Sequence, residues 1–191
     1  MKKKYYIGLS LIVAIVILII DQLTKKIITA TMNIGDSYEV IPHFLNITSH
    51  RNNGAAWGIL SGKMGFFYII TLIILAVLII FYIKETKYNA FMQVAISLLF
   101  AGALGNFIDR LFNGEVVDFI DTNIFGYDFP IFNIADSSLT IGVIFVIIFM
   151  TTNIFHIICL YGCCLSPSSP HPSCQRKYHA LRVFICFILL L

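Results

Sequence analysis

Four long stretches without Asp, Glu, Lys or Arg constrain the fold of this chain more than any other feature of its 191 residues. These stretches are residues 5–20, 64–83, 88–108 and 137 to about 165. A helix that crosses the ~30 Å hydrocarbon core of a membrane needs roughly 20 apolar residues. The second and third stretches meet this length, and the apolar pattern of the first continues beyond Asp21 to Ile27 and Ile28. Because the stretches are continuously apolar rather than alternating, we predict an all-α membrane protein with four transmembrane helices, and not a β-barrel.

The composition agrees with a membrane protein. The chain is 59% hydrophobic and 12% charged, whereas about a quarter of the residues of a soluble domain are charged. The net charge is only +3 and the basic residues are scattered along the chain. We therefore expect no nucleic-acid partner.

The first apolar stretch also has features of a cleaved signal peptide. Lys2, Lys3 and Lys4 precede it, as positive residues precede the apolar core of such a peptide. No small-residue cleavage pattern follows, and Asp21 and Lys25 continue a helical pattern instead. We expect this stretch to be retained as the first membrane span.

The charged residues are sorted by side of the membrane. Four spans place both termini on one side, and eight of the 13 Lys and Arg residues fall there, against five on the other. The cluster at residues 2–4, beside the first span, favours cytoplasmic termini. Nine of the 10 acidic residues, all except Glu85, fall at the outer ends of the helices or in the outer loops. Chemistry performed by carboxylates is therefore expected at the extracytoplasmic face.

The first outer loop, residues 32–63, contains two distinct patterns. Residues 39–48 are rich in β-forming residues and partly alternate in polarity, which predicts a small extracytoplasmic β element. Residues 51–58 contain Gly54 and Gly58, which permit backbone shapes that other residues resist. This second pattern is typical of a plain turn and equally of a loop that a ligand approaches closely.

Polar residues also recur on single faces of two predicted helices. Asp21 and Lys25 are four residues apart, which favours an ion pair with a structural role. In the third helix two adjoining stripes hold Ala101, Gly105 and Asp109, and Gly102, Asn106 and Arg110. Small residues let helices pack closely and polar ones bond across the interface, so this face should meet other helices. Arg110 can also hold a backbone carbonyl or an anionic group of a substrate.

Asp118 and Asp136 are the strongest candidates for catalysis. Asp118 lies among apolar residues, and Asp136 begins the fourth helix, where a carboxylate ordinarily serves as an N-cap. Capping accounts for Asp136 but not for Asp118. If the second outer loop folds back, the two carboxyl groups converge and share a proton. One can then act as general base on a water and the other as general acid, as in aspartic proteases.

These residues resemble those of lipoprotein signal peptidases, the signal peptidase II family. The resemblance covers about residues 5–150. Five short motifs occur in the order of that family: residues 21–25, 52–56, 102–110, 117–119 and 132–136. Each motif alone is weak, but five in order at the expected helix ends are specific.

The resemblance implies an aspartic endopeptidase of the bacterial cytoplasmic membrane. Its substrates would be prolipoproteins that already carry diacylglyceryl, its other partners would be membrane lipids, and it would act as a monomer without metal or other cofactor. The catalytic residues would be Asp118 and Asp136. The substrate site would be lined by Asn52, Gly54, Arg110 and Asn133, and the supporting scaffold would comprise Asp21, Lys25, Asn106 and Asp109.

The C-terminal region does not resemble that family. All five cysteines follow residue 158, and residues 166–173 contain three prolines. We therefore predict a peptidase domain over residues 1–155 and an atypical, dispensable tail over residues 156–191. A metal site formed by tail cysteines with His156, His171 or His179 matches no zinc spacing and is not expected.

Three other functions compete with this prediction. The Gly-x-Gly-Asp sequence of presenilin-type and prepilin-type peptidases is absent. A small proton-coupled transporter or channel subunit would also use paired carboxylates, but near the middle of the membrane. A purely structural helix bundle leaves the acidic second loop without a purpose. The transporter is the main alternative to the peptidase.

Overall fold

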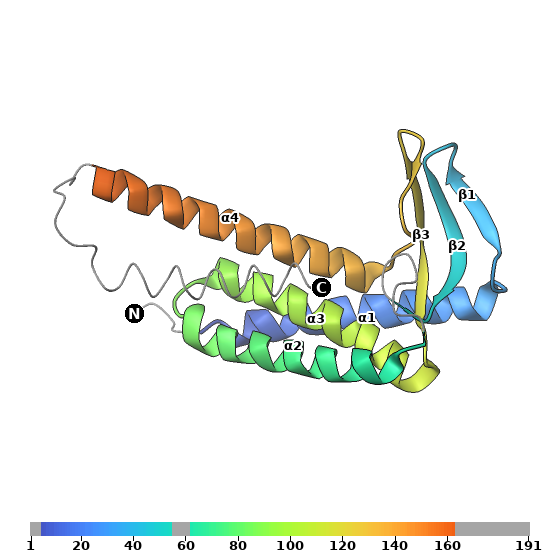
Figure 1. Cartoon of the computed structure of the whole chain (residues 1–191), viewed down its shortest axis with the longest axis horizontal. Helices are drawn as coiled ribbons and strands as arrows, with labels where there is room; N and C mark the ends of the chain where they lie inside the picture. Colours follow the sequence, from blue (N-terminus) through green and yellow to red (C-terminus); the bar gives the residue numbers. More distant parts are fainter. Residues whose placement is uncertain (1–4, 55–61, 163–191) are drawn as a thin grey trace. The chain divides into compact units, whose positions relative to one another are not determined.

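The computed structural model describes residues 5–54 and 62–162 of the chain, with side chains to residue 152 (Figure 1). Its helices there are α1 (Ile7–Thr31), α2 (Met64–Glu85), α3 (Ala90–Asn113) and α4 (Ile134–Gly162). Each contains a segment long and apolar enough to cross a membrane, which confirms the four predicted spans. The chain divides into two compact units, Met1–Val146 and Ile147–Leu191. The sheet and every contact of the candidate site belong to the first unit.

Two helix boundaries matter for the predictions. Helix α1 continues through Asp21 and Lys25 to Thr31, as the extended apolar pattern indicated. Helix α4 begins at Ile134, three residues before the predicted start of the span. It also runs across the boundary predicted between residues 155 and 156, which stays a prediction. The 55–58 part of the Gly54–Gly58 loop and the tail's cysteines and histidines lie outside the residues whose side chains are described.

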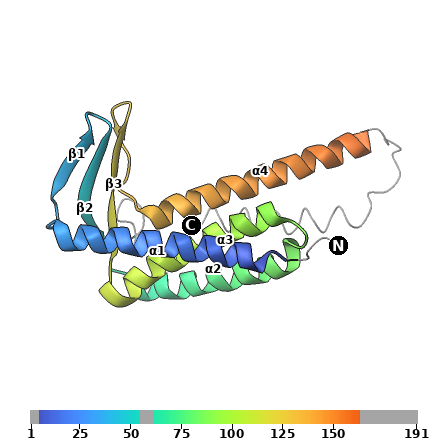
Figure 2. The ribbon, with the colours of Figure 1, turned by 180° about the vertical axis from the view of Figure 1, so that it is seen from behind.

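Helix α3 is the central helix of the bundle. It packs against both α1 and α2, and the three lie side by side in both views (Figures 1 and 2). Its predicted packing face is buried, including Ala101, Gly105 and Asp109. A Cβ added to Gly102 would lie 2.5 Å from both the carbonyl oxygen of Ala135 and Oγ of Ser138. Glycine is therefore required here because α4 passes too close for any side chain.

Both ends of α3 are defined by specific residues. At its N-terminus the side chain of Asn89 accepts a hydrogen bond of 2.8 Å from the backbone N–H of Met92, which is ordinary N-capping. At its C-terminus Gly114 adopts a left-handed conformation with φ of 73°, which few residues other than glycine adopt without strain. The chain turns there into the sheet, so the last turn of α3 lies directly beside it.

An antiparallel sheet forms one end of the first unit. It has the order β1 (Ser37–Ile41), β2 (Leu45–Asn52), β3 (Val116–Ile124) and β4 (Tyr127–Asp128). Both views show it across the ends of α1 and α3 rather than along their sides (Figures 1 and 2). The predicted β element at residues 39–48 is confirmed by β1 and β2. Strand β3 was not predicted, although it is the longest strand and carries Asp118.

The pairing of β2 with β3 contains an irregularity. Ile47 pairs with Ile120, but His50 pairs with Asp118, so three steps along β2 match two steps along β3. The extra residue forms a β-bulge at residues 48–49. A bulge of this kind changes which face of the sheet the following side chains occupy.

The bulge determines where the side chain of Asn52 points. Directly paired residues share a face of an antiparallel sheet, and successive residues alternate between faces. Asn52 pairs with Val116, which is two residues from Asp118 and on the same face. If the strands paired regularly from Ile47 onwards, with no bulge, Asn52 would lie opposite residue 115 and project from the other face. The bulge therefore brings Asn52 to Asp118.

Candidate active site

The second outer loop folds back along β3, as the convergence of Asp118 and Asp136 requires. After the β3–β4 hairpin, Phe132 pairs with Ile120 in an isolated bridge. The backbone N–H groups of Phe119 and Ile120 both donate to the carbonyl oxygen of Phe132, at 3.0 and 2.8 Å. This pairing places Asn133, the next residue, beside Asp118. The start of α4 is thereby positioned against the strand.

Asn133 contacts both carboxyl groups and is fully buried. Its Nδ2 donates to Oδ1 of Asp118 at 2.7 Å. Its backbone N–H donates to Oδ2 of Asp136 at 3.2 Å, and its Oδ1 accepts from the backbone N–H of Asp136 at 3.0 Å. Asn133 thus brings the two candidate catalytic residues into one site.

The local structure corrects the capping role considered for Asp136. The reciprocal bonds between Asn133 and Asp136 form a capping box, in which the N-cap side chain and a side chain three residues later satisfy each other's backbone N–H. The N-cap of α4 is therefore Asn133, and Asp136 lies in the first helical turn. A carboxylate is also favoured there by the partial positive charge of the helix N-terminus.

The surroundings of Asp118 are more polar than its sequence neighbours suggested. The side chains of Val117 and Phe119 point to the other face of β3 and form a small core with Ile28. The carboxylate of Asp118 instead accepts from Nδ2 of Asn52 at 3.0 Å as well as from Asn133. Only 2% of Asp118 is exposed, so amide groups rather than water solvate it.

Burial changes the acidity of Asp118. Loss of hydration, followed by the nearby charge of Asp136, raises the pKa of Asp118 from 3.8 to about 7, although the bonds from Asn52 and Asn133 act in the opposite direction. Desolvation and a like charge both disfavour the ionised carboxylate. The group can therefore hold a proton at neutral pH, as a general acid must.

Asn106 links Asp136 to the buried scaffold. Its Nδ2 donates to Oδ1 of Asp136 at 2.7 Å. Its Oδ1 accepts from Nζ of Lys25 at 3.1 Å and from Nδ2 of Asn133 at 3.2 Å. Every hydrogen-bonding group of this amide is used within the protein.

The predicted Asp21–Lys25 ion pair is present and is part of a triad. Nζ of Lys25 lies 2.9 Å from Oδ2 of Asp21 and 2.9 Å from Oδ2 of Asp109. Oδ1 of Asp21 also accepts from the backbone N–H of Ala135 at 2.9 Å, so α1 helps to hold the start of α4. Oδ2 of Asp109 accepts from the backbone N–H of Val117 at 3.3 Å, which ties α3 to β3.

Gln22 completes this network and was not predicted from the sequence. Its Nε2 lies within 3.1 Å of both Oδ2 of Asp21 and Oδ1 of Asp109. Its position next to Asp21 within the first family-like motif was the one available signal. Hydrophobic periodicity alone does not distinguish such a partly buried, bonded amide from an exposed one.

Arg110 reaches the first outer loop. Its Nη2 donates to the carbonyl oxygen of Gly54 at 3.2 Å, so the predicted contact with a backbone carbonyl is present. The guanidinium also lies over the ring of Phe67, 4.8 Å from its centre, in a cation–π arrangement. Within the described residues its buried Nε has no hydrogen-bond partner. The structure therefore brings Asn52 and Asn133 to the carboxyl groups. Arg110 is joined to Asn52 through the backbone of Gly54, whose N–H donates to Oδ1 of Asn52.

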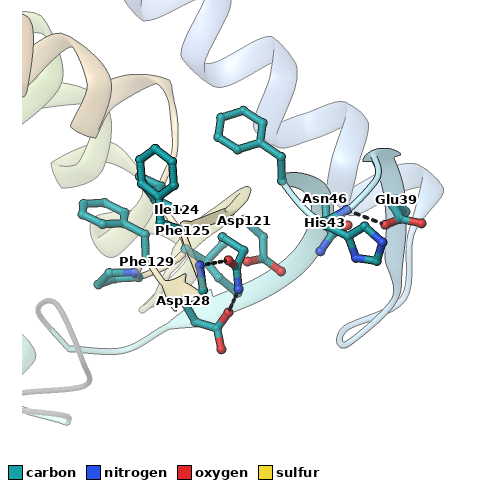
Figure 3. Close-up of a pocket in the computed structure, with 13 residues that line it drawn as sticks. Glu39, His43, Asn46, Asp121, Ile124, Phe125, Asp128 and Phe129 are labelled. Carbon is teal, nitrogen blue, oxygen red and sulfur yellow. Dashed lines mark hydrogen bonds between the residues drawn. The ribbon is translucent and has the colours of Figure 1, made fainter.

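A separate hollow lies away from these residues (Figure 3). Its lining includes Glu39 and His43 near the β1–β2 turn and Asp121 and Asp128 of the β3–β4 hairpin. Asp121 follows Asp118 by three residues on the same strand, so their side chains project from opposite faces. The hollow is therefore not continuous with the carboxylate site. Within the described residues no three His, Cys, Asp or Glu side chains are grouped to hold a metal ion.

Comparisons with known proteins show which proteins this chain is similar to. The family model described as signal peptidase (SPase) II matches residues 13–152. A lipoprotein signal peptidase of Staphylococcus haemolyticus (strain JCSC1435) is 86% identical over 148 residues, which are 78% of this chain and 94% of that protein. A lipoprotein signal peptidase of Staphylococcus aureus is 77% identical over 148 residues, covering 78% of this chain and 91% of its own length.

Two solved structures are also similar, and both are described as bacterial membrane enzymes. One has a TM-score of 0.77 and 67% sequence identity, and the match covers 90% of this chain and 99% of that structure. The other has a TM-score of 0.74 and 76% identity, with 78% and 97% covered.

Proposed function

Since the chain belongs to the signal peptidase II family of aspartic peptidases and is thus a protease that removes signal peptides from prolipoproteins, we propose that Asp118 and Asp136 are its catalytic pair. The observation that carries this proposal is the bridging position of Asn133, which bonds to both carboxyl groups. Family membership also decides between the peptidase and the transporter that the sequence left open.

The two carboxyl groups would hydrolyse the peptide bond through one shared proton. The carboxyl groups of Asp118 and Asp136 are bridged by Asn133 and do not both ionise readily, and the pKa of Asp118 near 7 is in keeping with one proton on the pair. The ionised group takes a proton from water, whose oxygen attacks the scissile carbonyl carbon. The protonated group donates to the carbonyl oxygen. Collapse of the tetrahedral intermediate then breaks the C–N bond, and a proton passes to the leaving amine.

Neighbouring groups would hold the substrate for this attack. Nε of Arg110, which has no hydrogen-bond partner among the described residues, would donate to a substrate carbonyl, and the guanidinium is already fixed by Gly54 and Phe67. Asn52 and Asn133 orient the carboxyl groups and so align the water. A diacylglyceryl group on the substrate cysteine would keep the cleavage site at the membrane surface, where these residues lie at the ends of the helices.

The membrane arrangement follows from the same proposal. Both termini would be cytoplasmic and the carboxylate pair extracytoplasmic, in the cytoplasmic membrane of a bacterium. The sheet is at the end of the bundle opposite to the C-terminal end of α2 (Figure 1), where Glu85 is the last helical residue, so the nine acidic residues expected outside would share its side. The chain would act as a monomer surrounded by lipid, and residues 156–191 would be dispensable.

Separate replacement of Asp118 and Asp136 by Asn tests the catalytic assignment. Cleavage of a diacylglyceryl-modified prolipoprotein, followed by gel shift with purified full-length chain, should fall by roughly 10²–10⁴-fold or more in each variant. Asp121→Asn is the matched control, because Asp121 is on the same strand but on its other face; this variant should keep its activity. Turnover at the normal rate by either folded pair variant would refute the assignment. Cleavage of the unlipidated precursor would contradict the substrate specificity alone.

A further inference from the structure

Three asparagine side chains donate their amide N–H groups to the catalytic carboxyl pair. Asn52 and Asn133 donate to Asp118, and Asn106 donates to Asp136. An asparagine amide offers a donor at one end and an acceptor at the other. If it rotates by half a turn, it presents its oxygen to the carboxylate and repels it. The orientation of each amide is therefore part of the catalytic arrangement.

Two of these amides are oriented by the backbone. Oδ1 of Asn52 accepts from the backbone N–H of Gly54 at 2.9 Å. Oδ1 of Asn133 accepts from the backbone N–H of Asp136 at 3.0 Å. A backbone N–H can only donate, so in both residues the oxygen is held in place and the NH₂ group must face Asp118.

Among the described residues, the Asn106 side chain has no such backbone partner and is oriented by other side chains. Its Oδ1 accepts from Nζ of Lys25 and from Nδ2 of Asn133. The bond from Lys25 is the stronger of the two, because its donor is charged whereas the Asn133 amide is neutral. Lys25 is an ammonium that can only donate. It is therefore the main group that determines which end of Asn106 faces Asp136.

We infer that Lys25 is a positioning residue for catalysis, which acts through Asn106 to keep an amide N–H directed at Asp136. Lys25 is itself fixed, because Asp21 and Asp109 each lie 2.9 Å from its Nζ and only 3% of its side chain is exposed. The structural triad and the catalytic pair are thus connected by one side chain. This inference rests on the assignment of Asp118 and Asp136 as catalytic.

The consequence is a defined pH dependence of catalysis. An N–H bond to Asp136 stabilises its ionised form, which is the form that serves as general base. Loss of this bond should move the acid limb of the activity profile to higher pH. The charged groups that act directly on Asp136 are Lys25 of α1 and Arg110 of α3, and its charge in turn acts on Asp118 of β3. The titratable groups next to these are Asp21 of α1 and Asp109 of α3 at Lys25, Tyr68 of α2 at the carbonyl of Arg110, and His50 of β2, which pairs with Asp118.

Asn106→Ala is the first test, because it removes the donor while leaving the ion pairs of Lys25 in place. We expect the midpoint of the acid limb of kcat/KM to rise by about one pH unit, with roughly 10-fold lower activity below it, from the usual strength of a hydrogen bond to a charged group. The measurement uses the full chain and a diacylglyceryl-modified prolipoprotein. An acid limb that coincides with that of the unaltered protein overturns the inference.

Lys25→Met with Asp109→Asn tests the role of Lys25 itself. The triad of two carboxylates and one ammonium has a net charge of −1, and in this double variant Asp21 alone retains it. A shift of the acid limb then reports the orientation of Asn106 rather than a change in charge. Asp109→Asn alone is the background control. We expect the double variant to show the shift of Asn106→Ala and the background control not to show it.

Gln22→Met distinguishes positioning from simple stabilisation. Gln22 belongs to the same buried network but bonds to Asp21 and Asp109 rather than to Asn106. Gln22→Met should lower the thermal stability of the protein without moving the acid limb of its kcat/KM profile. If the double variant behaves like Gln22→Met, Lys25 is only structural and the inference fails. If Asp118→Asn and Asp136→Asn retain activity, the catalytic assignment fails instead.

Discussion

The burial of Asp118 predicts that its replacement by Asn will favour the folded protein more at high pH than at low pH, relative to the unaltered chain. The native carboxyl group is 2% exposed, and burial together with Asp136 raises its pKa to about 7. A group with a raised pKa binds more protons in the folded than in the unfolded state between the two pKa values. The free energy of unfolding must therefore fall as the pH rises from about 4 to 7 and level off above that.

The expected size follows from the two pKa values. With a pKa of 3.8 in the unfolded chain and about 7 in the folded chain, the folded protein should lose roughly 2–3 kcal/mol between about pH 5 and about pH 8. Asn at this position cannot ionise, so the variant does not lose folding stability in this way as the pH rises. Its NH₂ group would face the NH₂ group of Asn52 or of Asn133, because both amides direct their donors at this position. This cost does not change with pH, so the prediction concerns how the difference in stability between the two proteins varies with pH.

Thermal unfolding of the purified proteins in detergent measures this difference. The Tm of Asp118→Asn minus the Tm of the unaltered chain should rise by roughly 5–10 °C from about pH 5 to about pH 8. Thr122→Val is the control, because it is a neutral change on the same face of β3; its difference should not vary with pH. Since Asp136 is adjacent, the measured dependence belongs to the pair. A difference in Tm that stays constant or reverses over this range would refute the reasoning.

Three further predictions concern packing, the bulge and the tail. Gly102→Ala should destabilise the fold by about 1–3 kcal/mol, because its Cβ would lie 2.5 Å from a backbone oxygen of α4; Gly65→Ala, whose Cβ has nothing within 4 Å, should change Tm little, and equal effects would contradict the packing argument. Asn52→Ala removes the amide donor that the bulge brings to Asp118, so cleavage should fall at least about 10-fold; full activity would show that Asn52 is not needed at Asp118. Truncation after Phe155 should preserve cleavage in membranes, and loss of activity in a stably inserted protein would show that the tail is required.

Strand β3 was not predicted from the sequence because its own residues do not strongly favour a strand. Its residues include Asp118 and Asp121 among apolar neighbours, and acidic residues are uncommon in isolated strand patterns. The strand is stabilised by pairing with β2 and with Phe132, which are distant in sequence. Its identity as a strand is therefore a consequence of tertiary pairing rather than of local preference.

The sequence alone determined the four spans, the ion pair of Asp21 with Lys25 and the small-residue face of α3. These features depend on hydrophobic length and on helical periodicity, which are local properties. The motif order further indicated Asp118 and Asp136, but not how they are held.

Only the tertiary structure decided the arrangement around those two residues. The bond from Asn133 to Asp118, the position of Asn52 on the face of Asp118 and the link from Lys25 through Asn106 to Asp136 all join residues that are distant in the chain. A shift of one residue in strand register, or half a turn of one amide, would reverse the contact while leaving the sequence pattern unchanged. Such contacts are decided by how the elements pack, because nothing in the local sequence distinguishes the two outcomes.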